Sequence, residues 1–252
     1  MFRSLQRQAI ALVRLTGVVT HLLSGAWTIW WRFPKISQPE RNAQVQAWAA
    51  TMLRRLSITL AVHGNPAVQG PVLLASNHIS WLDIVVIHAA RHCRFISKSD
   101  VKHWPLVGLL ATGAGTLYIE RQSRRDAMRV VHDMAERLRA GDVLAIFPEG
   151  TTGDGLQVLP FHANLLQAAI SADAPVQPIA LHFSDRITGE YSLAPCYIGD
   201  DTLVVSVWRT LCAGHLQAQV HFGEVQLANG RSRRAWADDL RAAIVDMRTD
   251  QF

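Results

Sequence analysis

The chain has 252 residues, enough for one α/β domain with a complete hydrophobic core and an appended segment, but too few for two large domains. Hydrophobic residues make up 49% of the chain and charged residues 18%, a balance that favours association with a membrane over a freely soluble protein. The net charge of +5 indicates an anionic partner, either a phospholipid surface or nucleic acid.

The first 35 residues differ in character from the rest of the chain. Basic residues precede an uncharged run, 15–31, which ends in Trp27, Trp30 and Trp31. This run approaches the roughly 17 to 25 residues that cross a bilayer, and its aromatic end suits a membrane interface. A single span, an interfacial helix and a core helix of a soluble domain are all consistent with it; we expect one of the two membrane arrangements. No small-residue cleavage site follows, so a cleaved signal peptide is not expected.

Residues 36–56 are more polar, but apolar residues such as Val45, Trp48 and Met52 recur at helical spacing. They predict a second helix that packs back on the first. We therefore expect a membrane-associated helical segment over residues 1–56 and an α/β domain over residues 57–252.

From Ser57 onward, short β-type runs alternate with helical patterns. This alternation predicts a largely parallel central sheet flanked by helices. The clearest helix is 123–139, where Ser123 and Asp126 form a capping signature and Gly141 ends the pattern. Strands are expected at 58–62, 72–75, 94–97, 116–119, 143–147, 176–182 and 218–222, and further helices at 81–90, 164–171, 202–212 and 232–248.

His78 lies on the turn between the expected strand 72–75 and the helix that follows. Ser80 can cap this helix, and Asp83 then falls where a carboxylate faces the positive end of the helix dipole and stays ionised. Such a carboxylate can fix the tautomer of His78 and stabilise the imidazolium that forms when the ring takes a proton. The pair then acts as a general base with its orienting partner. The spacing alone equally allows a capping Asp83 beside a polar loop histidine.

Two more polar groups follow the ends of expected strands. Glu149 comes after the strand 143–147, and Arg121 after the strand 116–119. Because chemistry in open α/β sheets gathers at the carboxyl ends of strands, a base, a carboxylate and a guanidinium are expected to converge there. Loops are polar in general, so this convergence is also compatible with a surface edge.

The stretch from Asn77 to Asp83 resembles the histidine-x4-aspartate motif of the glycerolipid acyltransferases, the family that includes 1-acylglycerol-3-phosphate O-acyltransferase. Three further blocks resemble that family in the same order, at residues 115–121, 147–151 and 176–180. The resemblance implies an O-acyltransferase that moves a fatty acyl group from acyl-coenzyme A or acyl-carrier protein to the hydroxyl of a lysolipid. The expected acceptor is 1-acylglycerol-3-phosphate, which gives phosphatidic acid.

The resemblance also implies roles for individual residues. His78 becomes the base and Asp83 its orienting partner, and the acceptor hydroxyl attacks the thioester directly. A thioester is already activated, so neither metal, cofactor nor covalent serine is required, and no Gly-x-Ser-x-Gly elbow is present. The implied substrate-binding residues are Arg121 at the anionic headgroup, Glu149 and Gly150 at its polar part, Pro178 in the pocket wall, and Asn77, Gly115, Thr151 and Thr152 from the same blocks. A surface ion pair for Arg121 and a helix cap for Glu149 are the structural alternatives.

Thr152 departs from the family pattern, because many lysophosphatidate enzymes carry arginine at this position. An arginine fork suits a phosphate dianion, whereas a threonine near Asp154 is less cationic. This difference leaves room for another acceptor, and lyso-ornithine lipid is the alternative that we would test first.

The expected partners are the lysolipid, a coenzyme A or carrier-protein thioester, and the membrane, at the cytoplasmic face of the bacterial inner membrane. Nucleic acid is not expected, because no DNA- or RNA-binding motif accompanies the basic residues. Three scattered cysteines predict reduced thiols rather than disulfides. His88 and His92 stand four apart without a carboxylate ligand, so no metal site is expected.

Two hypotheses of other classes remain open. In a thioesterase or lipid hydrolase, His78 would activate water instead of a lysolipid hydroxyl. In a non-enzymatic lipid-binding protein, His78 would be dispensable. The sequence does not distinguish coenzyme A from carrier protein as donor, and it leaves the acyl length and the oligomeric state open.

Overall fold

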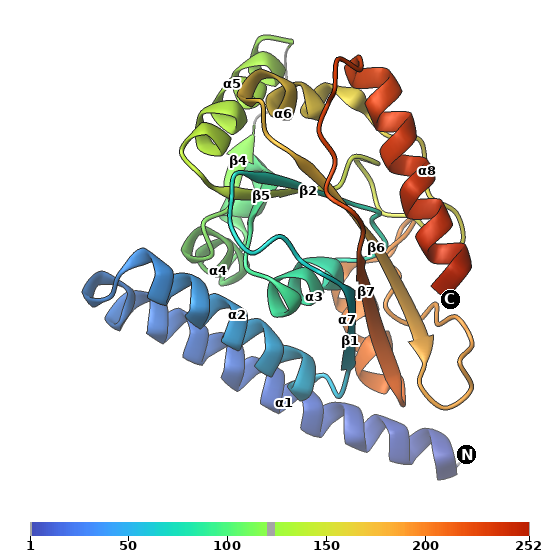
Figure 1. Cartoon of the computed structure of the whole chain (residues 1–252). Helices are drawn as coiled ribbons and strands as arrows, with labels where there is room; N and C mark the ends of the chain where they lie inside the picture. Colours follow the sequence, from blue (N-terminus) through green and yellow to red (C-terminus); the bar gives the residue numbers. More distant parts are fainter. Residues whose placement is uncertain (1, 120–123, 252) are drawn as a thin grey trace.

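The computed structural model describes residues 2–119 and 124–251, and within them the strands form one sheet in the order β1-β7-β6-β2-β5-β3-β4 (Figure 1). Strands β6 and β7 are antiparallel, and all other neighbouring strands in this part of the chain are parallel. The predicted largely parallel sheet is therefore confirmed. The strands are β1 Thr59–Gly64, β2 Val72–Ser76, β3 Arg94–Lys98, β4 Leu117–Ile119, β5 Val143–Ile146, β6 Val176–Asp185 and β7 Leu216–Phe222.

Helices cover both faces of the sheet, and the central strands β2 and β6 are buried along nearly their whole length (Figure 1). In one hydrophobic core, residues of α1, α2, α3 and α7 pack together against the sheet. In the other, residues of α5, α6 and α8 pack against the opposite face around the fully buried Trp236. The α-helices are α1 Phe2–Trp31, α2 Gln38–Arg55, α3 Leu82–Ala90, α4 Val107–Gly113, α5 Arg124–Arg139, α6 Leu166–Ala172, α7 Leu203–Cys212 and α8 Arg233–Gln251, with 3-10 turns η1 Phe33–Lys35, η2 Ser99–His103 and η3 Ala163–Leu165.

Helix α4 is the element that sequence patterns did not predict. It has seven residues, two of which are glycines, and glycine is a poor helix former. A Cβ at Gly108 would lie 2.2 Å from the carbonyl oxygen of Lys102, so the close packing of α4 on η2 requires a glycine there. Tertiary packing rather than local propensity therefore determines this helix.

Helices α1 and α2 form an antiparallel pair, which confirms the prediction that the second helix packs back on the first (Figure 1). The ring of His21 stacks on Trp48 with centroids 5.0 Å apart, and the indole N–H of Trp48 donates to the carbonyl of His21 at 3.2 Å. Helix α2 buries Met52 and Leu53 in the core that it shares with α3. Residues 1–56 are thus joined to the α/β domain through a common core.

The outer face of α1 is apolar and exposed. The helical stretch Gln6–Lys35 is long and apolar enough to cross a membrane by length and composition, and only 17% of its most apolar 18 residues are buried. Val13 is 72% exposed, and Trp27, Trp30 and Trp31 form an exposed cluster at the other end. Most of the apolar surface of α1 therefore has no partner within the described part of the chain.

Candidate active site

His78 lies at the carboxyl edge of the sheet, in the turn between β2 and α3. Its Nδ1 is 2.8 Å from Oδ2 of Asp83, whose side chain is fully buried, whereas the His78 side chain is 18% exposed. The same carboxylate oxygen accepts the N–H groups of Ile79 at 2.6 Å and Ser80 at 2.9 Å. Because this oxygen acts as an acceptor, Nδ1 of His78 carries the hydrogen. The lone pair at Nε2 is then free to take a proton.

The local sequence explains why the turn has this shape. The hydroxyl of Ser80 accepts the N–H of Leu82 at 3.2 Å, and Asp83 closes the turn by accepting the N–H of Ser80. These are the contacts predicted for a cap at Ser80, but the helix begins at Leu82, so its N-cap residue is Trp81, which makes no side-chain cap hydrogen bond. The Ser80 hydroxyl also donates to the carbonyl of Pro195 at 2.5 Å, a contact that sequence spacing cannot predict.

An aromatic stack holds the ring of His78 from one side. The imidazole lies parallel to Phe147, with centroids 3.8 Å apart and planes 9° apart. Phe147 in turn stacks on Phe95 at 5.6 Å. Since Phe147 is the first residue of the loop after β5, the third sequence block supplies the surface against which the imidazole of His78 packs. The stack restricts rotation of the ring and excludes water from that face.

Glu149 and Asn77 fix the backbone on either side of His78. One carboxylate oxygen of Glu149 accepts the N–H of His78 at 2.7 Å, and the other accepts the N–H of Leu159 at 2.9 Å. Burial raises the pKa of Glu149, and these two hydrogen bonds oppose the shift. The amide of Asn77 donates to the carbonyl of Leu181 on β6 at 3.1 Å and accepts its N–H at 2.7 Å. Both residues therefore hold His78 in place, and their contacts to substrate stay a prediction.

The loop after β5 contains three other predicted site residues. Gly150 has φ +73°, and a Cβ there would lie 2.9 Å from His162, so glycine is needed at this position. Thr151 is exposed to solvent. The hydroxyl of Thr152 donates to the carbonyl of Tyr197, in the connection between β6 and α7. Thr152 thus lies at the site edge, but its hydroxyl already has an acceptor within the protein.

The structure does not bring every predicted residue to His78. Gly115 precedes β4, and its carbonyl accepts a hydrogen bond from Nε of Arg94, the first residue of β3. Gly115 therefore lies at the amino edge of the parallel strands. This edge is away from His78, and the contact of Gly115 to substrate stays a prediction. Pro178 is buried within β6, where it pairs with Ala75 of β2. Ala75 lies three residues before His78, so Pro178 is within the sheet rather than in a loop at its carboxyl edge. Arg121 lies outside the described residues, and its role stays a prediction.

Two arginines of α8 that sequence analysis missed hold the loop after β5. Arg241 donates to the carbonyl of Val158 at 2.6 Å, and Arg248 donates to the carbonyl of Gly155. Burial lowers the pKa of Arg248. Their spacing of seven residues on one helix face is visible in the sequence, but nothing in the sequence relates that face to this loop.

His88 on α3 and His92 in the connection that follows it pack beside each other, away from the turn that contains His78. The two rings are 5.5 Å apart, and His88 lies edge-on against Phe95. Burial lowers the pKa of His88 to about 3 and that of His92 to about 4, so both rings are neutral at physiological pH. Among the residues that the structure describes, no three His, Cys, Asp or Glu side chains gather in a way that would hold a metal ion.

Comparison with known proteins gives consistent matches. A family model described as Acyltransferase matches residues 59–182. The chain is 39% identical to a 1-acyl-sn-glycerol-3-phosphate acyltransferase of Neisseria gonorrhoeae, over 81% of this chain and 80% of that relative. It is 34% identical to a lyso-ornithine lipid O-acyltransferase of Pseudomonas aeruginosa, over 82% of this chain and 78% of that relative. Its fold is similar to the crystal structure of the 1-acyl-sn-glycerophosphate acyltransferase PlsC from Thermotoga maritima, with a TM-score of 0.71, 16% identity and 98% of both chains covered.

These similarities extend well beyond the four short blocks. The matched span contains His78, Asp83 and the loop after β5, and the two relatives are similar across about four fifths of the chain. The resemblance predicted from the blocks is therefore confirmed. The chain belongs to the glycerolipid acyltransferase family, and it is an O-acyltransferase.

Proposed function

We propose that this enzyme transfers a fatty acyl group from a coenzyme A or carrier-protein thioester to the free hydroxyl of 1-acylglycerol-3-phosphate, giving phosphatidic acid. The observation that carries the proposal is the His78–Asp83 pair, which leaves Nε2 of a half-buried histidine free at the carboxyl edge of the sheet. The relative with 39% identity, which is named for this acceptor, supports the choice of lysolipid.

The residues suggest a direct transfer. Nε2 of His78 takes the proton of the lysolipid hydroxyl while its oxygen attacks the thioester carbonyl carbon, and a tetrahedral oxyanion forms. Asp83 stabilises the imidazolium through Nδ1–H. The carbon–sulfur bond then breaks, the ester remains on the lysolipid, and the proton from the imidazolium passes to the leaving thiolate. No covalent acyl-enzyme is needed in this sequence of steps.

A second acceptor, lyso-ornithine lipid, is favoured by one specific observation. Thr152 stands where many lysophosphatidate enzymes have arginine, and its hydroxyl is engaged by the carbonyl of Tyr197. This position therefore presents no guanidinium to a phosphate. Relatives named for lyso-ornithine lipid are 36% and 34% identical to the chain, which supports keeping this candidate.

The acceptor is tested with purified enzyme and a panel of lysolipids, with acyl-coenzyme A and acyl-carrier protein supplied in parallel. We expect kcat/KM to be highest for 1-acylglycerol-3-phosphate, and Thr152→Arg to raise it further relative to lyso-ornithine lipid, because a guanidinium pairs strongly with a phosphate dianion, whereas the ornithine head is zwitterionic. A higher kcat/KM for lyso-ornithine lipid would replace the first candidate with the second. Fatty-acid release at full rate without any lysolipid would instead indicate a thioesterase.

We also propose that the enzyme works at a membrane surface, on its cytoplasmic side. The exposed apolar face of α1 and the tryptophan cluster support this, as does Lys35, whose ammonium lies 3.4 Å from the ring centroid of Trp31. Tryptophan and lysine side by side suit the headgroup region of a bilayer. The three cysteines are free thiols, in keeping with a reducing compartment.

Replacing Trp27, Trp30 and Trp31 together with serine is expected to lower the fraction of enzyme that floats with anionic phospholipid vesicles, because these rings supply much of the exposed aromatic surface. The control is Met128→Ser on α5, which removes an exposed apolar side chain (74% exposed) from the other face of the sheet. Equal flotation of the triple variant and the wild type would contradict the proposed membrane face.

A further inference from the structure

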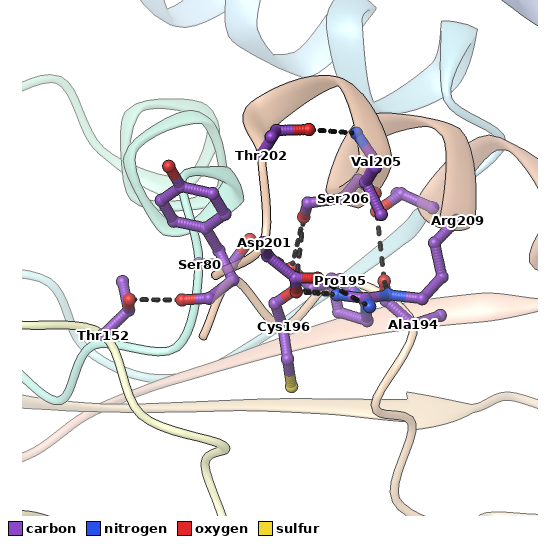
Figure 2. Close-up of polar contacts among 12 residues, drawn as sticks. Ser80, Thr152, Ala194, Pro195, Cys196, Asp201, Thr202, Val205, Ser206 and Arg209 are labelled. Atoms are coloured by element: carbon purple, nitrogen blue, oxygen red, sulfur yellow. Dashed lines mark hydrogen bonds and ion pairs between the residues drawn. The ribbon is translucent and has the colours of Figure 1, made fainter. Parts of the chain in front are cut away.

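The connection between β6 and α7 runs alongside the site, and one side chain holds it there (Figure 2). Arg209 on α7 donates from Nε to the carbonyl of Ala194 at 3.0 Å. Its Nη2 donates to the carbonyl of Cys196 and pairs with Oδ2 of Asp201 at 2.7 Å. We call residues 194–201 the bridging segment. One guanidinium thus binds the start, the middle and the end of this segment.

The bridging segment in turn contacts both loops of the site. The carbonyl of Pro195 accepts the hydroxyl of Ser80 at 2.5 Å, and the carbonyl of Tyr197 accepts the hydroxyl of Thr152. The N–H of Tyr197 donates to the carbonyl of Ile79 at 3.2 Å. The N–H groups of Ile79 and Ser80 donate to Asp83. The bridging segment therefore contacts the two residues that bind this carboxylate, but not the carboxylate itself.

Helix α7, which carries Arg209, is itself anchored by hydrogen bonds. The single O–H of its buried Ser206 is shared between the carbonyls of Pro195 at 3.3 Å and Cys196 at 3.2 Å. At the other end of the helix, Arg14 of α1 donates to the last carbonyls, those of Leu211 and Ala213, at 2.8 Å each. A helix fixed at both ends can hold an irregular segment in one position.

We propose that Arg209 is a positioning residue for acyl transfer, which acts through the bridging segment on Ser80 and Thr152. The segment contains no regular strand or helix, so ladder hydrogen bonds do not fix the direction of its carbonyls. A planar guanidinium donates in several fixed directions at once, which a lysine ammonium cannot reproduce. Arg209 therefore sets where the carbonyls of Pro195 and Tyr197 lie, and with them the two hydroxyls of the site.

Loss of Arg209 has two distinguishable consequences. The first is on kcat, because loosening of the Ser80 turn shifts the base, and a misplacement of about 1 Å costs on the order of 10²-fold in rate. The second is on the KM for lysolipid, because Thr152 moves. This expected change in the lysolipid KM rests on the proposed acceptor role of the Thr152 loop. The KM for the acyl donor stays unchanged in both cases.

The first test compares Arg209→Gln with Arg186→Gln, which removes an exposed arginine from the same connection between β6 and α7. Activities are expressed per folded enzyme, with the folded fraction measured by circular dichroism and thermal unfolding. For Arg209→Gln we expect kcat to fall by about 10- to 100-fold and the lysolipid KM to rise, with the donor KM constant. Arg186→Gln keeps wild-type values. Arg209→Lys recovers part of the loss.

A double-mutant cycle distinguishes positioning from general support of the fold. In the background Ser80→Ala with Thr152→Val, the hydroxyls through which Arg209 acts are gone, so adding Arg209→Gln has little further effect on kcat per folded enzyme. Effects that multiply across the cycle would overturn the inference, as would an Arg209→Gln enzyme with wild-type kcat and KM. If Arg209→Gln does not fold, Arg209→Lys takes its place in the cycle. Wild-type transfer in the same assay tests the proposed function separately.

Discussion

Replacing His78 with alanine is expected to lower kcat by about 10³-fold and to leave the KM of both substrates near the wild-type value. In the proposed mechanism, the imidazole removes the proton of the lysolipid hydroxyl, a step that the activated thioester does not provide. Its ring is partly exposed and its backbone N–H, which Glu149 accepts, is kept in the variant. The loss is therefore expected in turnover rather than in folding. Initial rates with saturating thioester and lysolipid measure it.

His103→Ala is the matched control, because His103 is exposed on η2, outside the turn that holds the base. Added imidazole gives a second check. The alanine variant leaves a slot between Phe147 and Asp83 where the ring stacked, and free imidazole bound there restores part of the rate. An alanine variant with activity close to wild type would contradict a role for His78 as base.

The strands and most helices follow from the sequence because their signals are local. Each strand contains apolar residues in a short run, and β2, with five buried residues, is bounded by a proline and a polar turn. Helix α4 is different, since close contact at Gly108 rather than propensity forms it. The position of Gly115 also could not be predicted, because its block shows a turn before a strand but not which edge of the sheet that turn occupies.

The same contrast separates the parts of the site. His78 and Asp83 are five residues apart on one turn, so capping rules place the carboxylate near the imidazole, and the structure shows the contact that the spacing left open. Asn77, by comparison, binds Leu181 across 104 residues, and Glu149 binds the His78 backbone across 71. Such partners depend on the strand order, which the sequence does not give. Arg209, Arg241 and Arg248 act on main-chain carbonyls, and carbonyls carry no sequence signature.

Replacing Asp83 with asparagine is expected to lower kcat by about 10²-fold or more without unfolding the protein. All three described hydrogen bonds to this side chain go to Oδ2, so the single carbonyl oxygen of asparagine can accept the same N–H groups. The variant keeps the shape of the turn and loses the negative charge that stabilises the imidazolium. If the amide turns its NH2 toward His78, the ring also adopts the tautomer with hydrogen on Nε2, which cannot act as base.

Asp83→Ala provides the contrast that separates charge from shape. It removes the acceptor for the buried N–H groups of Ile79 and Ser80, so we expect a loss of about 1–3 kcal/mol in the free energy of unfolding in addition to the loss of kcat. Denaturant unfolding of the two variants, with Asp100→Asn at an exposed position as control, measures the difference. If asparagine at position 83 retained wild-type kcat, Asp83 would be a helix cap without influence on the base, and the local pairing at 2.8 Å would have no catalytic meaning.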